Sequence, residues 1–379
     1  MKKLISKFFG NFADTLREAD KFFLFLCISA SIFGCFIIYS ATQTMGSNRQ
    51  TIMQVSCLFG GVIIALVLSR IDYKKLAKLW WLIAGAAILL VGLTFFIGYA
   101  PQGTDDKAWL RFGSLSFQPA ELLKIAFAIT FPLHLSKVKD EINAPKNLLL
   151  LLLHGAFPVL LIHFQGDDGT AMIFAIMFIC MMFIAGINKR LIVLGGIGIA
   201  AFLPVAWLFL INEDQKKRFL SLLNPEADLL GDGWQQWRAR IALASGGWFG
   251  QGYMNGPNVQ TGTIPEGYND FIFASLGEEF GFVTAILVLL LLVGICLRTL
   301  WIASKNTDDL GKYICVGLFA MFAANILINL GMCLSLLPVV GVTLPFISAG
   351  GTNLVCLFIG VGLVLSTYAH REQESIYIR

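Results

Sequence analysis

The chain has 379 residues, of which 57% are hydrophobic and only 14% are charged, and its mean hydropathy is +0.74. A soluble domain is about half apolar and about a quarter charged, so this composition excludes a soluble globular protein and indicates repeated membrane spans. The net charge of +4 is small and does not indicate a nucleic-acid partner.

The first apolar run is long enough to span a bilayer and follows a polar segment of mixed charge, so we expect no cleavable signal peptide. A helix needs about 20 apolar residues to cross the membrane, and about ten runs approach that length. We therefore expect an all-α integral membrane protein with a single membrane domain over residues 1–379. The expected spans lie near residues 21–41, 52–70, 79–99, 119–136, 147–164, 170–187, 190–211, 271–300, 312–336 and 350–369.

The positive charges indicate how the chain is oriented, because cytoplasmic segments carry an excess of Lys and Arg. With the N-terminus inside, 19 Lys and Arg residues fall on cytoplasmic segments and 8 on outer segments, while Lys124 lies inside a span. An even number of spans with both termini cytoplasmic fits this bias.

One connection is much longer than the others. Residues 212–270, between the seventh and eighth expected spans, form an extracytoplasmic loop rich in Gly, Trp, Asn, Asp and Gln. Long loops are usually functional or disordered. The aromatic residues in the middle of this loop (Trp234, Trp237, Trp248 and Phe249) favour packing onto the membrane surface over disorder.

The eight cysteines all lie within or at the ends of apolar runs. None forms a CxxC pair, and none stands beside a histidine at metal-ligand spacing. We expect them to pack between helices as small apolar residues, without disulfides or a zinc site.

The fourth expected span opens with a charged pair. Pro119 suits the first turn of a helix, and Glu121 and Lys124, three residues apart, lie on one face of it. Ionisable residues inside a span are costly and are functional candidates for that reason. The two residues either satisfy each other as an ion pair or line a polar cavity for a charged lipid headgroup.

The eighth expected span begins with one acidic residue and contains another. At about 1.5 Å per residue, Glu279 lies roughly 13 Å along the helix from Asp270, well below the outer surface. A carboxylate at that depth needs a partner or water. Asp270 is either an ordinary helix N-terminal acid, favoured by the macrodipole, or part of a site.

Two further polar features lie on the outer side. Asp167, on the short turn between the fifth and sixth spans, is either a helix N-cap or a site residue. The segment 338–351, which contains Ser348 and several Gly and Pro residues, is either a simple turn or a re-entrant segment lining a cavity. Together, these features indicate an outer-leaflet site for a polar or charged ligand, which suits an enzyme or a transporter.

A series of motifs also runs in a fixed order from about residue 16 to residue 370. The motifs are Leu16–Asp20, Ile38–Ala41, Lys107–Leu110, Phe117–Lys124, Gln165–Thr170, Asn224–Asp228, Gly233–Gln235, Ser245–Gly252, Pro265–Glu266, Asp270–Phe273, Asn329, Met332, Pro338, Gly341 and Leu344–Thr352. In type, order and spacing they resemble the FtsW/RodA/SpoVE family of lipid-linked peptidoglycan polymerases.

Four positions depart from the pattern of that family. Ala120 replaces the usual Ser, Gly166 the usual Pro, Gln251 the usual Lys, and Tyr268 a residue that is often His. Any contribution of that His to the site, or of that Lys to a phosphate contact, is absent in this chain. None of the four changes touches Asp270.

The resemblance implies an inverting glycosyltransferase of the bacterial inner membrane, which polymerises lipid II into glycan strands and releases undecaprenyl diphosphate. Inverting transfer needs a general base at the acceptor hydroxyl, and Asp270 is the expected catalytic residue. A divalent cation, Mg²⁺ or Mn²⁺, would arrive with the substrate diphosphate, and we expect neither a dedicated metal site nor an organic cofactor. The residues expected to bind substrate are Lys107, Arg111, Glu121, Lys124, Asp167, Arg218, Glu279 and Ser348.

The resemblance also implies a partner, a class B penicillin-binding protein transpeptidase. The sequence leaves open whether the chain serves elongation, division or sporulation, although its short tails favour the elongation (RodA-like) type. Two alternative functions remain. A lipid II flippase would also need an acidic cavity open to lipid, whereas a scaffold would not depend on Asp270.

Overall fold

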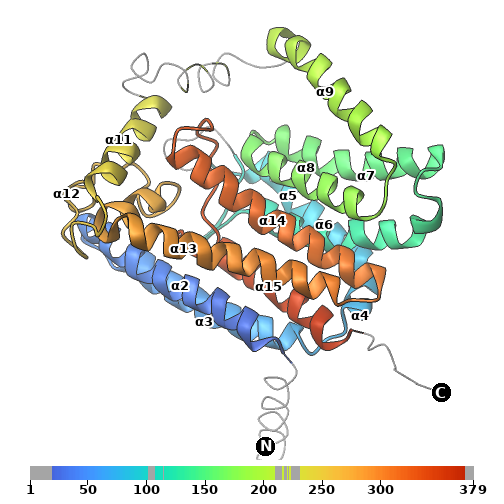
Figure 1. The fold of residues 1–379 in the computed structure, drawn as a ribbon, viewed down its shortest axis with the longest axis horizontal. Helices are drawn as coiled ribbons and strands as arrows, with labels where there is room; N and C mark the ends of the chain where they lie inside the picture. Colours follow the sequence, from blue (N-terminus) through green and yellow to red (C-terminus); the bar gives the residue numbers. More distant parts are fainter. Residues whose placement is uncertain are drawn as a thin grey trace, which may run out of the picture.

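The computed structural model describes residues 19–100, 107–113, 115–209, 216, 220, 222 and 231–371, which form a helical bundle with one small hairpin (Figure 1). The hairpin pairs β1 (Leu110–Phe112) with β2 (Leu115–Phe117) in antiparallel register. The helices are α2 (Lys21–Ala41), α3 (Arg49–Leu68), α4 (Tyr73–Lys78), α5 (Trp80–Ile97), α6 (Pro119–Val138), α7 (Pro145–His163), α8 (Asp168–Ile184), α9 (Lys189–Phe209), α11 (Asp232–Ser245), α12 (Pro257–Gln260), α13 (Ile272–Ser304), α14 (Asp309–Cys333) and α15 (Gly351–Ala369), with short 3₁₀ turns η1 (Gln43–Met45) and η2 (Lys139–Glu141).

Seven helices in the described part of the chain are long and apolar enough to cross a membrane: α2, α3, α5, α7, α13, α14 and α15. Helix α8 is apolar but has only 17 residues. Helices α6 and α9 coincide with the fourth and seventh expected spans. The helical multi-pass architecture is confirmed, and the count of ten spans stays a prediction.

Helix α14 lies at the centre of the bundle. It packs against α6, α8, α13 and α15. In α14, 78% of an 18-residue apolar window is buried inside the protein. In α5, the corresponding share is 17%. Helix α5 therefore turns most of its apolar surface outward, as a helix facing lipid does.

The two described ends of the chain lie at the same end of the bundle (Figure 1). Asp20, which caps α2, forms an ion pair of 2.7 Å with Arg298 near the end of α13. Trp301 of α13 contacts Tyr368 in the last turn of α15, with ring centroids 6.3 Å apart. The opposite end of the bundle carries the starts of α6, α8, α13 and α15 and is called the site end below.

Helix α13 is broken where the sequence predicted a continuous span. Gly281 has φ 78° and ψ 179°, a conformation that costs glycine little and other residues much. The loop after α11 fills the break with backbone hydrogen bonds: Gln251 and Gly252 donate to the carbonyls of Glu278 and Glu279, and Phe282 donates to that of Gly247. Backbone groups freed by the break thus remain satisfied, as burial demands.

The long loop contains two helices, α11 and α12, that the sequence analysis did not predict. Its aromatic side chains lie largely outside the core: Trp248 is 68% exposed and Phe249 83%. That exposure fits the predicted packing on a membrane surface, which stays a prediction. The motif at 224–228 lies outside the described residues.

The segment between α14 and α15 contains neither helix nor strand, yet most of it is buried. Phe346 and Ile347 are fully or almost fully buried. Gln54 of α3 donates to the carbonyl of Ser348 and accepts from the amide of Gly350. Of the two alternatives, a simple turn or a re-entrant segment, this depth within the bundle favours the re-entrant segment.

The close packing at the break predicts an effect on stability. A methyl group at Gly246, whose φ of −69° suits any residue, would overlap the carbonyl oxygen of Gly277. Gly246→Ala should therefore lower the free energy of unfolding by about 1–3 kcal/mol, as overpacking does. Gly85→Ala is the matched control, because nothing lies within 4 Å of the added methyl. Thermal unfolding in detergent compares the two; equal melting temperatures would contradict the close packing.

Candidate active site

The site end gathers polar residues from segments far apart in the sequence. Asp167, at the N-cap of α8, accepts a hydrogen bond from the Thr170 amide at 2.8 Å, as a helix cap does. Its other carboxylate oxygen accepts from Gln118 Nε2, just before α6, at 2.8 Å. Asp167 therefore both caps α8 and joins α8 to α6.

The predicted charged pair lies beside this junction. Lys124 Nζ is 2.9 Å from Glu121 Oε1, and both side chains are buried. Burial raises the pKa of Asp167, and the Lys124 ammonium partly offsets that rise. Glu121, Lys124 and Asp167 thus form one buried cluster, in which a single cation stands among two carboxylates.

Asp270 lies two residues before α13 and is held by its backbone. Its carbonyl oxygen accepts a hydrogen bond of 2.7 Å from Asn329 Nδ2 of α14, which also donates to the carbonyl of Val342. Its carboxylate faces the re-entrant segment, where Oδ2 is 3.8 Å from the position that a Cβ would take on Gly341. Carboxylate oxygen Oδ1 is buried and has no hydrogen-bond partner.

Burial, together with the negative charges of Glu266 and Asp167, raises the pKa of Asp270 to about 7. The influence of Asp167 shows that Asp270 shares an electrostatic environment with the α6–α8 cluster. A carboxylate with a pKa near neutrality takes up and releases a proton readily at physiological pH, which is the property of a general base.

The re-entrant segment contacts both the start of α8, which Asp167 caps, and the turn that carries Asp270. A Cβ on Gly169 of α8 would overlap the carbonyl oxygen of Val340, so α8 begins in direct contact with this segment. Ser348 accepts from the Leu344 amide and donates to the carbonyl of Asn269, next to Asp270. In the structure, predicted site residue Ser348 holds the segment against the turn that carries Asp270.

The remaining predicted residues lie elsewhere. Lys107 is exposed, and Arg111, on β1, is exposed 5.9 Å from the ring of Tyr99. Glu279 is buried in α13, where it accepts hydrogen bonds from Ser40 and Gln260 and so links α2 to the loop. Arg218 lies outside the described residues.

Two residues with a direct effect on Asp270 were absent from the predicted site. Glu266 acts through its charge and Asn329 through its hydrogen bond. Both stand in the family motifs, but sequence spacing alone gives neither role. Within the described ranges, no group of three or more His, Cys, Asp or Glu side chains is arranged to hold a metal ion.

Fold and site together define a multi-pass membrane protein with a buried acidic site at one end of its bundle. The chain belongs to the FtsW/RodA/SpoVE family, described as cell cycle proteins, whose model matches residues 20–373.

Named relatives support this membership. The peptidoglycan glycosyltransferase MrdB of Escherichia coli K12 is 34% identical over 363 residues, covering 94% of this chain and 95% of MrdB. Stage V sporulation protein E of Bacillus subtilis is 33% identical and covers 81% of this chain and 83% of its own length.

Solved structures share the fold. One, from work on the coordination of polymerization and crosslinking by a peptidoglycan synthase complex, has a TM-score of 0.81 at 26% identity and covers 94% of this chain and 99% of that one. The rod shape determining protein RodA of Thermus thermophilus has a TM-score of 0.70 at 24% identity, covering 94% of this chain and 98% of its own.

The buried pair predicts a coupled effect on stability. Glu121→Gln leaves the Lys124 charge without its partner at 2.9 Å, and removing one member of a buried pair costs about 3–5 kcal/mol. Replacing both, as Glu121→Gln with Lys124→Met, should recover much of that loss. A double-mutant cycle on thermal unfolding measures the coupling; strictly additive losses would contradict a paired state.

Proposed function

We propose that this chain polymerises lipid II and that Asp270 is the general base of the reaction. The observation that carries this proposal is the buried, unpartnered oxygen Oδ1 of a carboxylate whose pKa is about 7. The chain is a peptidoglycan glycosyltransferase, as its close relatives are named. The specific substrate and the roles of the residues are our proposal.

The proposed reaction is an inverting glycosyl transfer. Asp270 takes the proton from a sugar hydroxyl of the acceptor, and the oxygen attacks the anomeric carbon of a lipid-linked donor. The bond between that carbon and the diphosphate oxygen breaks, the carbon inverts, and undecaprenyl diphosphate leaves with the electron pair. A base at the attacking hydroxyl on the face opposite the leaving group is what inversion requires.

The negative charge of the leaving diphosphate needs compensation. Lys124 supplies a buried positive charge beside Asp167, whose own charge acts on Asp270. Lys107 and Arg111 lie on the chain that leads into α6, and Arg218 completes the proposed set. A divalent cation would reach the site bound to the substrate diphosphate and add to this compensation.

A flippase is the alternative function. The way in which Asp270 is held in the bundle distinguishes the two functions. Translocation needs a path for the headgroup through the bundle, whereas glycosyl transfer needs a base fixed at one end. Asp270 lies on a turn fixed by Asn329 and Ser348, at the site end of the bundle. That fixed position supports the enzyme.

We also propose ten spans, in the bacterial inner membrane, with both termini cytoplasmic and the site end facing outward. The charge distribution supports this orientation, and so does the position of both described ends on the side opposite the site. A class B penicillin-binding protein transpeptidase is the proposed partner, because a matching structure belongs to a complex that couples polymerization and crosslinking.

The role of Asp270 predicts a specific loss. Asp270→Asn should lower the rate of lipid II polymerisation by at least about 10²-fold, as loss of a general base does, while lipid II binding and melting temperature stay near wild type. Asp140→Asn, an exposed residue of η2, is the control. Gel analysis of glycan made by purified protein measures the product, and robust polymer from Asp270→Asn would refute the assignment.

The pKa of Asp270 predicts the pH profile. The base works only when deprotonated, so kcat/KM should fall as the pH drops through about 7. Glu266→Gln removes a negative charge that raises this pKa, so the acidic limb should move to lower pH. Glu141→Gln, an exposed residue remote from the site, should leave the limb in place. An unmoved limb in Glu266→Gln would contradict the electrostatic link.

A further inference from the structure

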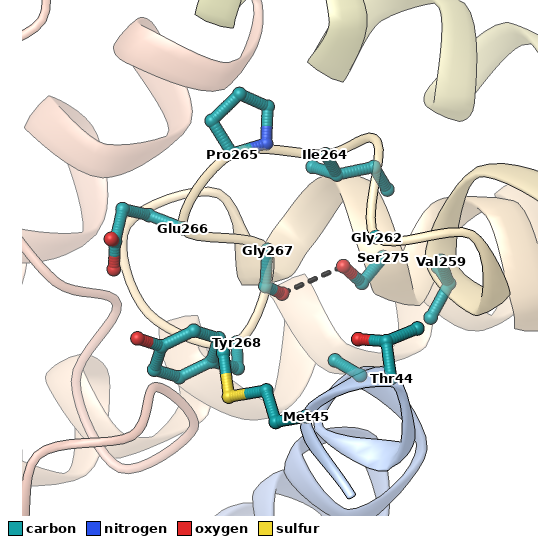
Figure 2. Close-up of a pocket in the computed structure, with 11 residues that line it drawn as sticks. Thr44, Met45, Val259, Gly262, Ile264, Pro265, Glu266, Gly267, Tyr268 and Ser275 are labelled. Atoms are coloured by element: carbon teal, nitrogen blue, oxygen red, sulfur yellow. Dashed lines mark hydrogen bonds between the residues drawn. The ribbon is translucent and has the colours of Figure 1, made fainter.

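A cavity of about 180 Å³ lies beside the turn that carries Asp270 (Figure 2). Its walls come from the end of α2, from η1, from α12 and the loop that follows it, and from the first turn of α13. Cavities that enclose drug-sized ligands start at about 300 Å³. This cavity therefore has room for one small ring or side chain, and a whole lipid headgroup would not fit.

The cavity wall combines polar and apolar groups. Thr44 and Tyr268 contribute hydroxyls, Glu266 contributes a carboxylate, and Met45 and Ile264 contribute apolar surface. Burial, and then the negative charge of Glu266 and a hydrogen bond to it, raise the pKa of Tyr268 to about 12, so the Tyr268 hydroxyl stays protonated and is held against the Glu266 carboxylate. Scattered hydrogen-bonding groups on an apolar wall match a sugar ring, whose edge carries hydroxyls and whose face carries C–H groups.

The charge of the cavity argues against a phosphate ligand. Glu266 is the one charged residue in its lining, and it is negative. A diphosphate placed here would meet a carboxylate with no cation to compensate it. The cavity thus suits a neutral part of the substrate, away from the diphosphate that Lys124 is proposed to meet.

Backbone strain marks the same wall. Glu266 has φ 46°, in the left-handed region that few residues other than Gly adopt. Such strain persists only where the surrounding structure holds it, and it concentrates at functional sites. Here the amides of Asn269 and Phe271 hold it by donating to the Glu266 carbonyl at 2.9 and 3.1 Å.

Those hydrogen bonds make the cavity wall and Asp270 parts of one rigid turn, residues 266–271. The Tyr268 carbonyl accepts from the Ala349 amide at 3.0 Å, which ties this turn to the re-entrant segment. Ser275 fixes the other side by donating to the Gly267 carbonyl at 2.6 Å (Figure 2). A ring bound in the cavity would therefore sit at a fixed offset from the base.

We infer that this cavity is a saccharide subsite that holds a neutral sugar ring of the acceptor while Asp270 takes the proton of its attacking hydroxyl. The assignment rests on the proposed polymerase function and adds to it the residues that position the acceptor. The donor reacts at the carbon that bears its diphosphate, so its reacting ring would bring the diphosphate to this cavity. The acceptor reacts at a hydroxyl remote from its own diphosphate, and it therefore fits the cavity better than the donor. Fixed alignment of the hydroxyl with the base supplies the proximity that such a transfer needs.

Kinetics of the purified full-length protein provide the first test. Thr44→Phe places a ring in the cavity from an exposed position of η1, and Tyr268→Phe removes one hydroxyl. Each should raise the KM for lipid II, by at least fivefold for Thr44→Phe and threefold for Tyr268→Phe, with kcat within twofold of wild type. Ser47→Phe adds the same bulk three residues away, outside the cavity lining, and should leave KM unchanged.

Chemical protection provides a second test that needs no turnover. In an Asp270→Asn background, Thr44→Cys is alkylated with a maleimide and the labelled peptide is quantified by mass spectrometry. The probe is a lipid-free β-1,4-linked dimer of N-acetylglucosamine at millimolar concentration, which should slow labelling at least threefold. Labelling of Ser47→Cys in the same background should proceed at the same rate with and without the dimer.

The outcomes separate the two proposals. If wild-type protein makes polymer but Thr44→Phe keeps its KM and the dimer gives no protection, the subsite is refuted and the polymerase function stands. If wild-type protein makes no polymer from lipid II, the proposed function fails and the acceptor assignment fails with it. Raised KM values together with selective protection at residue 44 support the subsite.

Discussion

The site depends on one constraint: one oxygen of a carboxylate must be kept buried and unpartnered at the end of a membrane bundle. Asp270 meets it because its backbone, and not its carboxylate, is held in place. Asn329 binds its carbonyl, Glu266 closes the turn around it, and Oδ1 is left without a partner. Burial of an unpaired carboxylate is unfavourable, and the rest of the bundle must supply the stability that offsets it.

The surrounding architecture contributes to that stability by forming hydrogen bonds with backbone groups where α13 is interrupted. The loop after α11 donates hydrogen bonds to the carbonyls left free where α13 breaks at Gly281. Buried Glu278 accepts hydrogen bonds from the amides of Asn258 and Val259, which fixes α12 beneath the same loop. These hydrogen bonds hold the short half of α13 that begins after Asp270 against the loop.

Sequence patterns predicted the parts of this structure that depend on composition and local spacing. The apolar runs predicted the helices, and spacing of three residues predicted the contact between Glu121 and Lys124. The break at Gly281 was not predicted, because the neighbouring sequence does not distinguish this glycine from other glycines in spans. The loop segment that fills the break, around Gln251, is distant in the sequence. For the same reason, two further features could be recognised only in the three-dimensional structure. One is the effect of the Glu266 charge on the pKa of Asp270, and the other is the burial of Glu279 with hydrogen bonds from Ser40 and Gln260.

The protonation of Asp270 itself tests the account most directly. Infrared difference spectra of the purified protein, recorded across pH against Asp270→Asn, isolate the band of one protonated carboxyl group. A midpoint near pH 7 would agree with a buried carboxylate poised as a base. A midpoint near the ordinary value of 3.8 would show a solvated or paired group, and would contradict the central claim.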